Sequence, residues 1–307
     1  MLSTLVNTEQ YLDDFVSYLK DSKKATENTW QSYARDLRQF FQYLENIGQK
    51  NIDDVKKVHV DNYVSSLVGN GRAASSISRC IASIRAFYRY LRANDMSTAD
   101  PTRGVQTVRH SKKLPETLTV EEVNLLLMQP ETDSYRGQRD KAMLEMLYAT
   151  GIKVSELISL NLHDANLEVG YITCRTEDKR RDIPLYQAAK KALQVYVRHA
   201  RDGVLHDPDE QALFLNCNGS RITRQGFWKL LKNYQESAGI QKEITPQVLR
   251  NSFAVHLLEN GADLKSIQEM LGHNDISSTQ VYVNVLKSKI RKVYFSVHPR
   301  ATEDSKK

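Results

Sequence analysis

Apolar residues recur at three- and four-residue spacing through most of the chain, which is the period of amphipathic helices. The segments YLDDFVSYL and WQSYARDLRQFFQYL predict helix between residues 8 and 46, and a shorter helix is expected around Val58 to Val68. After a GNGR break, a further helix carries one apolar stripe made of Ile77, Ile81, Ile84, Tyr88 and Leu91. The first 94 residues therefore predict an all-α domain.

The second half of the chain mixes helices with one hairpin. Thr119 and Glu122 form a capping-box pattern, and the helical pattern of RDKAMLEMLYATGIKVSELISL breaks at Gly151. The segments GYITCR and RRDIPL, joined by TEDK, predict a β-hairpin between residues 170 and 185. We therefore expect a mainly α fold, with a helical domain at residues 1–94 and a mostly helical domain with a small β-sheet at residues 119–307.

Residues 95–118 predict a linker between the two domains. This segment has no periodicity, two prolines and five basic residues when His110 is counted. Lys112 and Lys113 lie within it, and we expect them to contact a polyanion.

Composition excludes several classes of protein. The 307 residues contain 43 Lys and Arg against 37 Asp and Glu, a formal net charge of +6. No apolar run reaches the roughly 18 residues that span a bilayer, and the first residues show no secretory signal, so a cytoplasmic protein is expected. The three cysteines lack metal-ligand spacing and are expected to be buried free thiols, with no metal and no cofactor. They are Cys80, Cys174 and Cys217.

Basic residues gather in one stretch of the first domain. Between residues 72 and 92 there are five arginines and no acid, and three of them share one flank of the predicted helix. A solvated helix face is the alternative, but such faces usually intersperse acids, so contact with phosphate groups is favoured. The five are Arg72, Arg79, Arg85, Arg89 and Arg92.

A second candidate site begins at TPQVLRN. Thr245 is a good N-cap and Pro246 suits the first helical position, which places Gln247 and Arg250 on one face of the first turn. A helix N-terminus attracts anions, and a planar guanidinium binds phosphate with two hydrogen bonds.

The stretch LGHNDISSTQVY supplies two further groups. Gly272 predicts a helix end, so His273 is expected on a tight turn. Asp275 can then cap a last helix that carries Tyr282. Arginine, histidine and tyrosine thus arrive on three successive short elements.

The blocks YATGIKVSELISL, VLRNSFAVHLLENGADLKSIQEMLGH and DISSTQVY resemble the signature of the tyrosine recombinases of the phage integrase family, most closely the Xer-type branch. The resemblance covers nearly the whole chain and implies an N-terminal SAM-like core-binding domain before the catalytic domain. It implies that Tyr282 attacks a DNA phosphate to leave a 3′-phosphotyrosine and a free 5′-hydroxyl, while Arg250 and His273 hold that phosphate. No metal or nucleotide is implied. Partners implied are double-stranded DNA and a homo- or hetero-tetramer with a related recombinase, in which the last helix packs onto a neighbouring protomer.

The chain departs from the family pattern at catalytic positions. Lys153 stands where the family has its first catalytic arginine, and Gln247 and Asn251 replace two histidines. The hairpin lysine that protonates the leaving oxygen aligns with Arg175 or Thr176. Lys179 lies nearby, displaced, and is counted with the DNA-binding residues. Because a guanidinium holds its proton too tightly to be a good acid, weakened or partner-dependent cleavage is expected. A catalytically impaired DNA-binding paralogue is the alternative.

Overall fold

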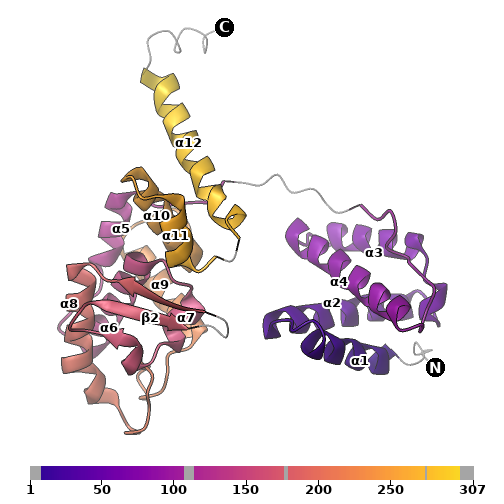
Figure 1. Ribbon diagram of the computed structural model, residues 1–307, viewed down its shortest axis with the longest axis horizontal. Helices are drawn as coiled ribbons and strands as arrows, with labels where there is room; N and C mark the ends of the chain where they lie inside the picture. The colour runs from indigo at the N-terminus through magenta and orange to yellow at the C-terminus, as the bar shows by residue number, and fades with distance from the viewer. Residues whose placement is uncertain (1–7, 107–113, 176–178, 274, 298–307) are drawn as a thin grey trace. The chain divides into compact units, whose positions relative to one another are not determined.

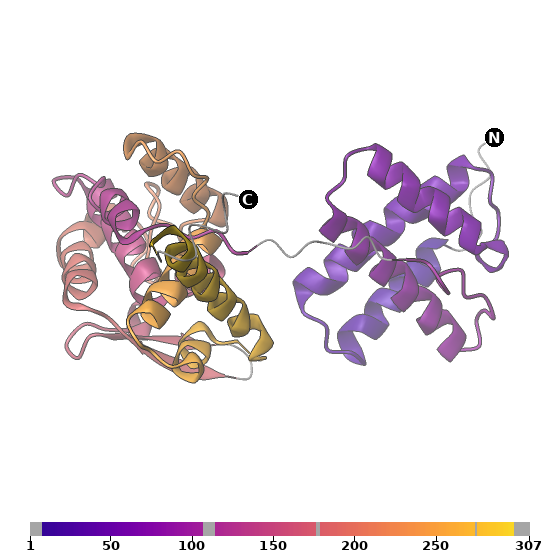
Figure 2. The ribbon, with the colours of Figure 1, turned by 90° about the horizontal axis from the view of Figure 1, so that it is seen from above.

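The chain folds into two compact units, Met1–Lys112 and Lys113–Lys307, which are described separately (Figures 1 and 2). The computed structural model describes residues 8–106, 114–175, 179–273 and 275–297, with only the backbone for 291–297. None of the helices in these ranges combines the length and the apolarity needed to cross a bilayer.

The first unit is built from helices that cross one another (Figure 2). The predicted helix between residues 8 and 46 is two helices separated by a short turn, and α4 packs against both α2 and α3. The predicted all-α character is confirmed. The elements are α1 (Thr8–Asp21), α2 (Glu27–Asn46), η1 (Ile52–Asp54), α3 (Lys57–Gly69) and α4 (Ala74–Ala93).

Aromatic rings from three helices fill the core of this unit. Phe15 of α1 meets Phe87 of α4 edge to face at 5.6 Å between ring centroids, and Phe41 of α2 meets the same ring at 5.3 Å. Each residue of the predicted α4 stripe is at most 2% exposed, so the periodicity identified the buried face. Val105 is also buried in this core, so the chain remains packed on the first unit beyond the end of α4.

The second unit is mostly helical with a small antiparallel sheet of order β1-β2-β3. The predicted hairpin is confirmed, with Thr173 paired to Asp182 and Arg175 to Arg180. The elements are α5 (Val120–Leu127), α6 (Tyr135–Thr150), α7 (Val154–Ser159), η2 (Leu162–Asp164), β1 (Ala165–Asn166), β2 (Tyr171–Arg175), β3 (Arg180–Pro184), α8 (Gln187–Val195), η3 (Tyr196–Ala200), η4 (Arg201–Val204), α9 (Arg224–Ser237), α10 (Pro246–Glu259), α11 (Leu264–Leu271) and α12 (Ser277–Val297).

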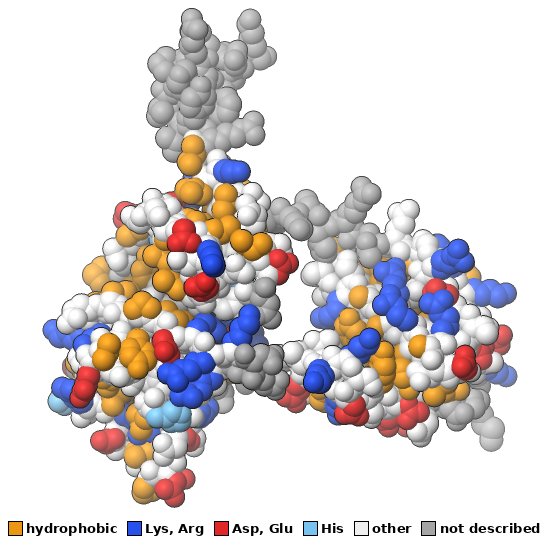
Figure 3. All heavy atoms as spheres, viewed as in Figure 1, with side chains coloured by type: hydrophobic (Ala, Val, Ile, Leu, Met, Phe, Trp, Pro, Cys, Tyr) orange, Lys and Arg blue, Asp and Glu red, His pale blue; other side chains and the backbone are white. Residues whose placement is uncertain are grey.

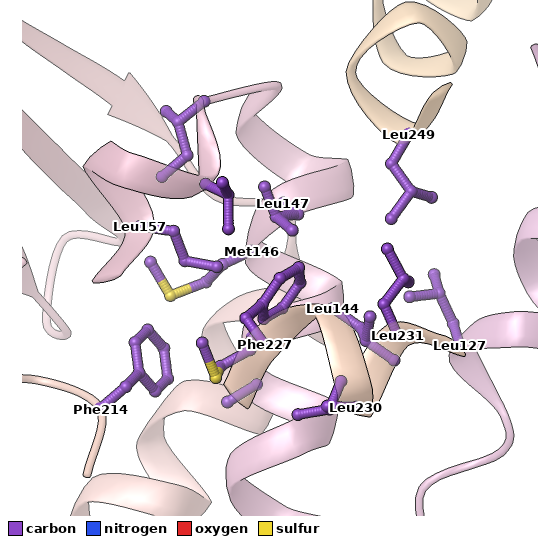
Figure 4. Close-up of a cluster of buried hydrophobic side chains, with 14 of the residues drawn as sticks. Leu127, Leu144, Met146, Leu147, Leu157, Phe214, Phe227, Leu230, Leu231 and Leu249 are labelled. Carbon is purple, nitrogen blue, oxygen red and sulfur yellow. The ribbon is translucent and has the colours of Figure 1, made fainter. Parts of the chain in front are cut away.

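Helix α6 forms the centre of the second core. Leu144, Met146 and Leu147 of this helix are fully buried and pack with Phe227 of α9 and Leu249 of α10 (Figure 4). Since α6 contributes apolar residues around its circumference, it is enclosed by its neighbours rather than lying at the surface. This enclosed helix gives α7 and α10 a fixed platform.

Helix α12 begins against α10 and α11 and then projects beyond the rest of the unit (Figure 1). Val285 is buried against the unit, whereas Ile290 is 59% exposed. The exposed apolar side chain agrees with the expectation that this helix meets a second protomer, which stays a prediction.

The expectation that all three cysteines are buried was wrong for one of them. Cys80 and Cys174 are buried, but Cys217 is exposed. It lies in a turn closed by the amide of Ser220, which donates to the side chain of Asn216 at 3.2 Å. A turn of this kind lies at the surface because its remaining backbone groups need water.

Candidate active site

Arg250 lies in the first turns of α10, whose start is fixed by its own sequence. The Thr245 hydroxyl accepts a hydrogen bond from the Val248 amide at 3.1 Å, and Pro246 occupies the first turn. The Arg250 side chain turns into the unit and is only 3% exposed. The start of α10 therefore places the positive charge of Arg250 in the protein interior.

The Arg250 guanidinium joins α10 to two other segments of the chain, one at Gly151 and one at residues 271–273. It donates to the carbonyl of Gly151, to the carbonyl of Leu271 at 2.7 Å and to Nε2 of His273 at 2.9 Å. Among the described residues, no carboxylate forms an ion pair with it. Burial lowers the pKa of Arg250, because a cation loses hydration there. A buried guanidinium without a carboxylate partner favours binding of an anion such as phosphate.

Two glycines form the backbone corners around this guanidinium. Gly151 ends α6 with φ 58°, and a Cβ there would lie 2.3 Å from the ring of Phe253. Gly272 ends α11 with φ 66°, and a Cβ there would lie 2.7 Å from the guanidinium of Arg181. Both positions have a left-handed backbone that favours glycine, and at Gly151 the Phe253 ring also leaves no room for a side chain.

His273 follows the second corner and lies between two partners. Its Nε2 faces Arg250, and its Nδ1 lies 2.9 Å from the hydroxyl of Thr279, which is fully buried. Because arginine can only donate, Nε2 must accept, and the ring proton is therefore on Nδ1 and donated to Thr279. Burial, followed by the positive charges of Arg250 and Lys153, lowers the pKa of His273 to about 4. The ring is neutral at pH 7.

This lowered pKa predicts how stability depends on pH. Between about pH 6.5 and about pH 4 the unfolded chain binds a proton at His273 that the folded chain does not. The folding stability that depends on a neutral His273 is therefore fully present above about pH 6.5 and is lost as the pH falls towards 4. We expect the unfolding free energy in denaturant titrations to decrease from pH 7.5 to pH 5, and to decrease less in His273→Gln. An equal decrease in both proteins would contradict this assignment.

Tyr282 is buried beside these groups, with 2% of its surface exposed. Its ring stacks on that of His273, with centroids 6.5 Å apart and planes inclined by 15°. Its hydroxyl donates to Oδ1 of Asn251 at 3.3 Å. Burial raises the pKa of Tyr282 and the Arg250 charge lowers it, with burial prevailing. The three groups expected from the sequence to meet therefore lie together.

Lys153 lies on the exposed turn before α7. Its amide donates to Glu156 at 2.8 Å, and its ammonium lowers the pKa of His273. Glu156 also accepts from Arg181 at 2.8 Å, and Arg181 donates to the carbonyl of Met270 at 3.0 Å. These contacts hold the α7 start, the hairpin and the end of α11 in one arrangement. Lys153 thereby keeps a positive charge near Arg250, but it lacks the planar guanidinium with which arginine forms two parallel hydrogen bonds.

Gln247 and Arg250 begin on the same helix turn but differ in burial. Gln247 is exposed, and its Nε2 donates to Oδ1 of Asn251 at 2.9 Å. It can offer a hydrogen bond to an anion at the helix start, but it cannot exchange a proton at neutral pH.

Arg175 ends β2 and is anchored by an acid. Its Nε donates to Asp164 at 3.2 Å, although more than half of its side chain is exposed. A groove of about 190 Å³ extends from Glu156 to Arg175 along the sheet. Lys179 is exposed immediately before β3, next to residues 176–178, which lie outside the described residues. Lys and Arg side chains gather at this end of the hairpin (Figure 3).

The five arginines predicted between residues 72 and 92 do not form one free basic face. Arg79 donates two hydrogen bonds to Asp36 of α2, at 2.9 and 2.8 Å, and Arg92 pairs with Asp100 at 3.1 Å. The acid missing from its own helix is thus supplied to Arg79 by a neighbouring one, and its contact with DNA stays a prediction. Arg85 donates weakly to the carbonyl of Val105 at 3.5 Å.

The other predicted DNA-contacting residues of this part of the chain are Arg72, just before α4, Arg89 of α4, and Lys112 and Lys113 of the predicted linker. Arg72 and Arg89 are exposed. Figure 3 shows Lys and Arg side chains over the α4 face. Lys112 and Lys113 lie outside the described residues.

Several residues at the site were not singled out from the sequence. Thr279, Arg181 and Glu156 carry no local signal of function, because each acts through a partner on another element. Helix α9 offered a signal that was missed: Arg224, Trp228 and Lys232 recur every four residues and are all exposed. A basic helix face with a central aromatic residue is typical of a nucleic-acid contact. Among the described residues, no group of three or more His, Cys, Asp or Glu is placed to hold a metal ion.

Comparison with known families matches both halves of the chain. The phage integrase family model matches residues 116–289, and the model of the phage integrase N-terminal SAM-like domain matches residues 12–95. Among solved structures, the XerA recombinase covers 95% of this chain at 27% identity with a TM-score of 0.53. The XerH site-specific recombinase, solved with palindromic difH in a post-cleavage complex, covers 95% at 21% identity with a TM-score of 0.76, which shows the fold.

Curated relatives are similar over nearly their whole length. The tyrosine recombinase XerD of Oceanobacillus iheyensis is 43% identical over 296 residues, which is 95% of this chain and 99% of the relative. The XerD of Staphylococcus aureus is 40% identical over 294 residues, which is 95% of this chain and all of the relative. The chain therefore belongs to the phage integrase family, as a tyrosine recombinase of the Xer type, a class of enzymes that break and rejoin DNA.

Proposed function

We propose that this protein is a site-specific recombinase that cuts and rejoins double-stranded DNA through Tyr282. The phenol oxygen attacks the phosphorus of a backbone phosphate, a Tyr–O–P bond forms, and the bond to the 5′-oxygen breaks. The phenol gives up its proton and the leaving 5′-oxygen takes one up, so the step is balanced. The observation that carries this proposal is the buried Arg250 guanidinium, which has no carboxylate partner within the described part of the chain and contacts His273 beside the Tyr282 ring.

Each group near Arg250 has a distinct part in this proposal. The guanidinium binds two oxygens of the phosphate and stabilises the charge that develops as the phenol attacks. Lys153 adds a point charge, and Gln247 adds a hydrogen bond at the start of α10. Arg175, held by Asp164, contributes charge next to the leaving group but is a poor proton donor. The site therefore attracts phosphate well but supplies acid catalysis weakly, so slow or partner-dependent cleavage is proposed.

Each unit is proposed to have its own DNA-binding surface, on α4 in the first unit and on α9 and the hairpin end in the second. Four protomers, of one kind or two, would hold two DNA sites, and the exposed Ile290 of α12 supports a contact between protomers. Such a complex would act in the cytoplasm on chromosomal or mobile-element DNA, in dimer resolution or in integration and excision.

The direct test first identifies the binding site by selection from random duplex sequences. It then uses that duplex with a nick next to the scissile phosphate. After cleavage the short 5′ strand diffuses away, so the covalent complex accumulates on a denaturing gel. Peptide mapping by mass spectrometry is expected to find the nucleotide adduct on Tyr282. Tight binding of the selected duplex without any adduct would instead favour the non-catalytic paralogue.

The DNA contacts of α4 are tested by salt dependence. Replacing both Arg85 and Arg89 by glutamine should reduce the slope of log affinity against log salt by about one unit per lost phosphate contact. Arg79→Gln is the matched control, because Asp36 already engages this guanidinium. It should lower the unfolding free energy and leave the slope unchanged. An unchanged slope in the double variant would place the DNA on another surface.

The altered catalytic positions predict a gain of activity. Lys153→Arg restores a planar fork, and Gln247→His restores a titratable group at the start of α10. The double variant should form the covalent complex at least about tenfold faster, a fraction of the 10²–10³ typical of one transition-state donor. Rates are measured at saturating protein, and the gain should vanish when Tyr282→Phe is added. Unchanged rates with normal DNA binding would mean that these side chains do not meet the phosphate.

A further inference from the structure

Asn251 occupies an unusual position, between the nucleophile and the segment that enters the second unit. It is 6% exposed and lies one residue after Arg250 on α10. Its Nδ2 donates to the carbonyl of Glu116 at 3.1 Å. Its Oδ1 accepts from Gln247 at 2.9 Å and from the Tyr282 hydroxyl at 3.3 Å. One buried amide is thus shared by three segments of the chain.

The partners of this amide leave it only one orientation. A backbone carbonyl can only accept, so the atom facing Glu116 must be the NH₂ group. The oxygen must then face Tyr282, and the tyrosine hydroxyl has to be the donor. The entering segment is itself fixed, because the Leu118 amide donates to Ser252 at 2.8 Å and the Leu118 carbonyl bonds to His256 at 3.1 Å. The Glu116 carbonyl is therefore a rigid reference point.

We propose that Asn251 is the positioning residue of the nucleophile: its locked amide takes the hydroxyl hydrogen of Tyr282 and so fixes the direction of the phenol oxygen. With the hydrogen held by Asn251, the oxygen lone pairs remain for the Arg250 side of the site, where the phosphate is proposed to bind. This inference rests on the proposed cleavage chemistry.

The same geometry defines what Asn251 cannot do. An amide oxygen accepts a hydrogen bond but does not take up a proton near neutral pH. The phenol proton must therefore leave to the phosphate, to water or to another group when the tyrosine attacks. A histidine at this position would have one ring nitrogen for Glu116 and one for Tyr282, and the second could take the proton. Asn251 can therefore orient the Tyr282 hydroxyl, but it cannot act as the base that a histidine at this position could be.

The first experiment measures single-turnover formation of the covalent complex on the nicked duplex. Asn251→Leu keeps the approximate volume and removes both hydrogen-bonding functions. We expect the rate to fall by about tenfold to a hundredfold, as for a misdirected nucleophile, with the dissociation constant for duplex DNA unchanged. Ser252→Ala is the matched control, since it breaks the neighbouring bond to the entering segment without touching Tyr282. Its melting temperature should fall while its rate stays at the wild-type value. A wild-type rate in Asn251→Leu would overturn the proposal.

The second experiment uses Asn251→His and gives an answer even if the leucine variant does not fold. The new base should add a pH-dependent step to the rate of covalent-complex formation. The rate should rise as the pH rises through the pKa of the introduced histidine. The pKa of this histidine should lie below the usual value of about 6.5, because the charge of Arg250 disfavours a second cation. Of the other charged groups near the site, Lys153 and Arg181 lower the pKa of His273 and Glu156 raises it, and His273 itself is neutral at these pH values. A profile identical to that of the wild type would contradict the proposal.

A third measurement separates this inference from the proposed function. Tyrosine labelled with ¹³C at Cζ reports phenol ionisation by NMR, and the Tyr282 signal is identified as the one missing in Tyr282→Phe. Asn251→Asp places a carboxylate against the hydroxyl and should raise the pKa of Tyr282 by about one unit or more, whereas Ser252→Ala should not. If the wild type formed no covalent complex but this shift appeared, the cleavage function would fail and the placement of Asn251 would stand. An unshifted phenol would reject the placement itself.

Discussion

Replacing Tyr282 by phenylalanine is expected to abolish the covalent protein–DNA complex and to leave duplex binding within about twofold. Phenylalanine fills the same space against His273 but has no oxygen to attack phosphorus. The lost hydrogen bond to Asn251 is a neutral one, worth about 1 kcal/mol of folding free energy, so the unit should stay folded. The measurement is the denaturing-gel assay on the nicked duplex, together with a binding titration at fixed salt.

A second tyrosine provides the control for this substitution. Tyr234 also donates its hydroxyl to a side chain, that of Asp140 at 3.0 Å, but it lies on α9 and outside the site. Tyr234→Phe should form the covalent complex at the wild-type rate. A covalent complex that persists in Tyr282→Phe would mean that another residue is the nucleophile, and the site built around Arg250 would lose its central role.

Replacing Arg250 by lysine should slow formation of the covalent complex by about 10² to 10³, the cost of losing one transition-state donor. Lysine keeps the charge but cannot hold the Leu271 carbonyl and His273 while also binding two phosphate oxygens. His273 would lose the donor that fixes its tautomer. Single-turnover rates at saturating protein separate this effect from weaker DNA binding.

Arg201 is the matched control for Arg250. Both side chains are 3% exposed and both donate to two backbone carbonyls, in the case of Arg201 those of Ala212 and Glu210. Arg201→Lys should therefore lower stability to a similar degree but leave the rate of the folded enzyme unchanged. Equal slowing in both variants would show that Arg250 acts only as a structural support.

The sequence alone determined the elements whose signals are local. Thr119 caps α5 and accepts from Glu122, Thr245 caps α10, and Gly151 and Gly272 end helices with positive φ, all as the patterns predicted. The α4 stripe and the hairpin followed from periods of 3.6 and 2. These features depend on residues within a few positions of one another, so a single stretch of chain carries the whole physical cause.

The order of Arg250, His273 and Tyr282 on consecutive elements also followed from local signals, because the helix end at Gly272 and the cap at Asp275 set the turn that carries His273. Family resemblance then supplied their chemistry. It also identified Lys153 and Gln247 as altered positions, but it could not say what those side chains would contact.

Only the tertiary structure decided which charges are free and which are already engaged. Arg79 belonged to a stretch without acids, yet it is held by Asp36, which lies 43 residues earlier on a neighbouring helix. From the sequence, Asn251 could be identified only as a residue that replaces a family histidine. The structure shows that its amide bonds to both Glu116 and Tyr282. The physical reason is that helix caps and periodicity depend on chain geometry over a few residues. The partner of a buried charge or amide depends instead on how whole helices pack, and no short stretch of sequence contains that information.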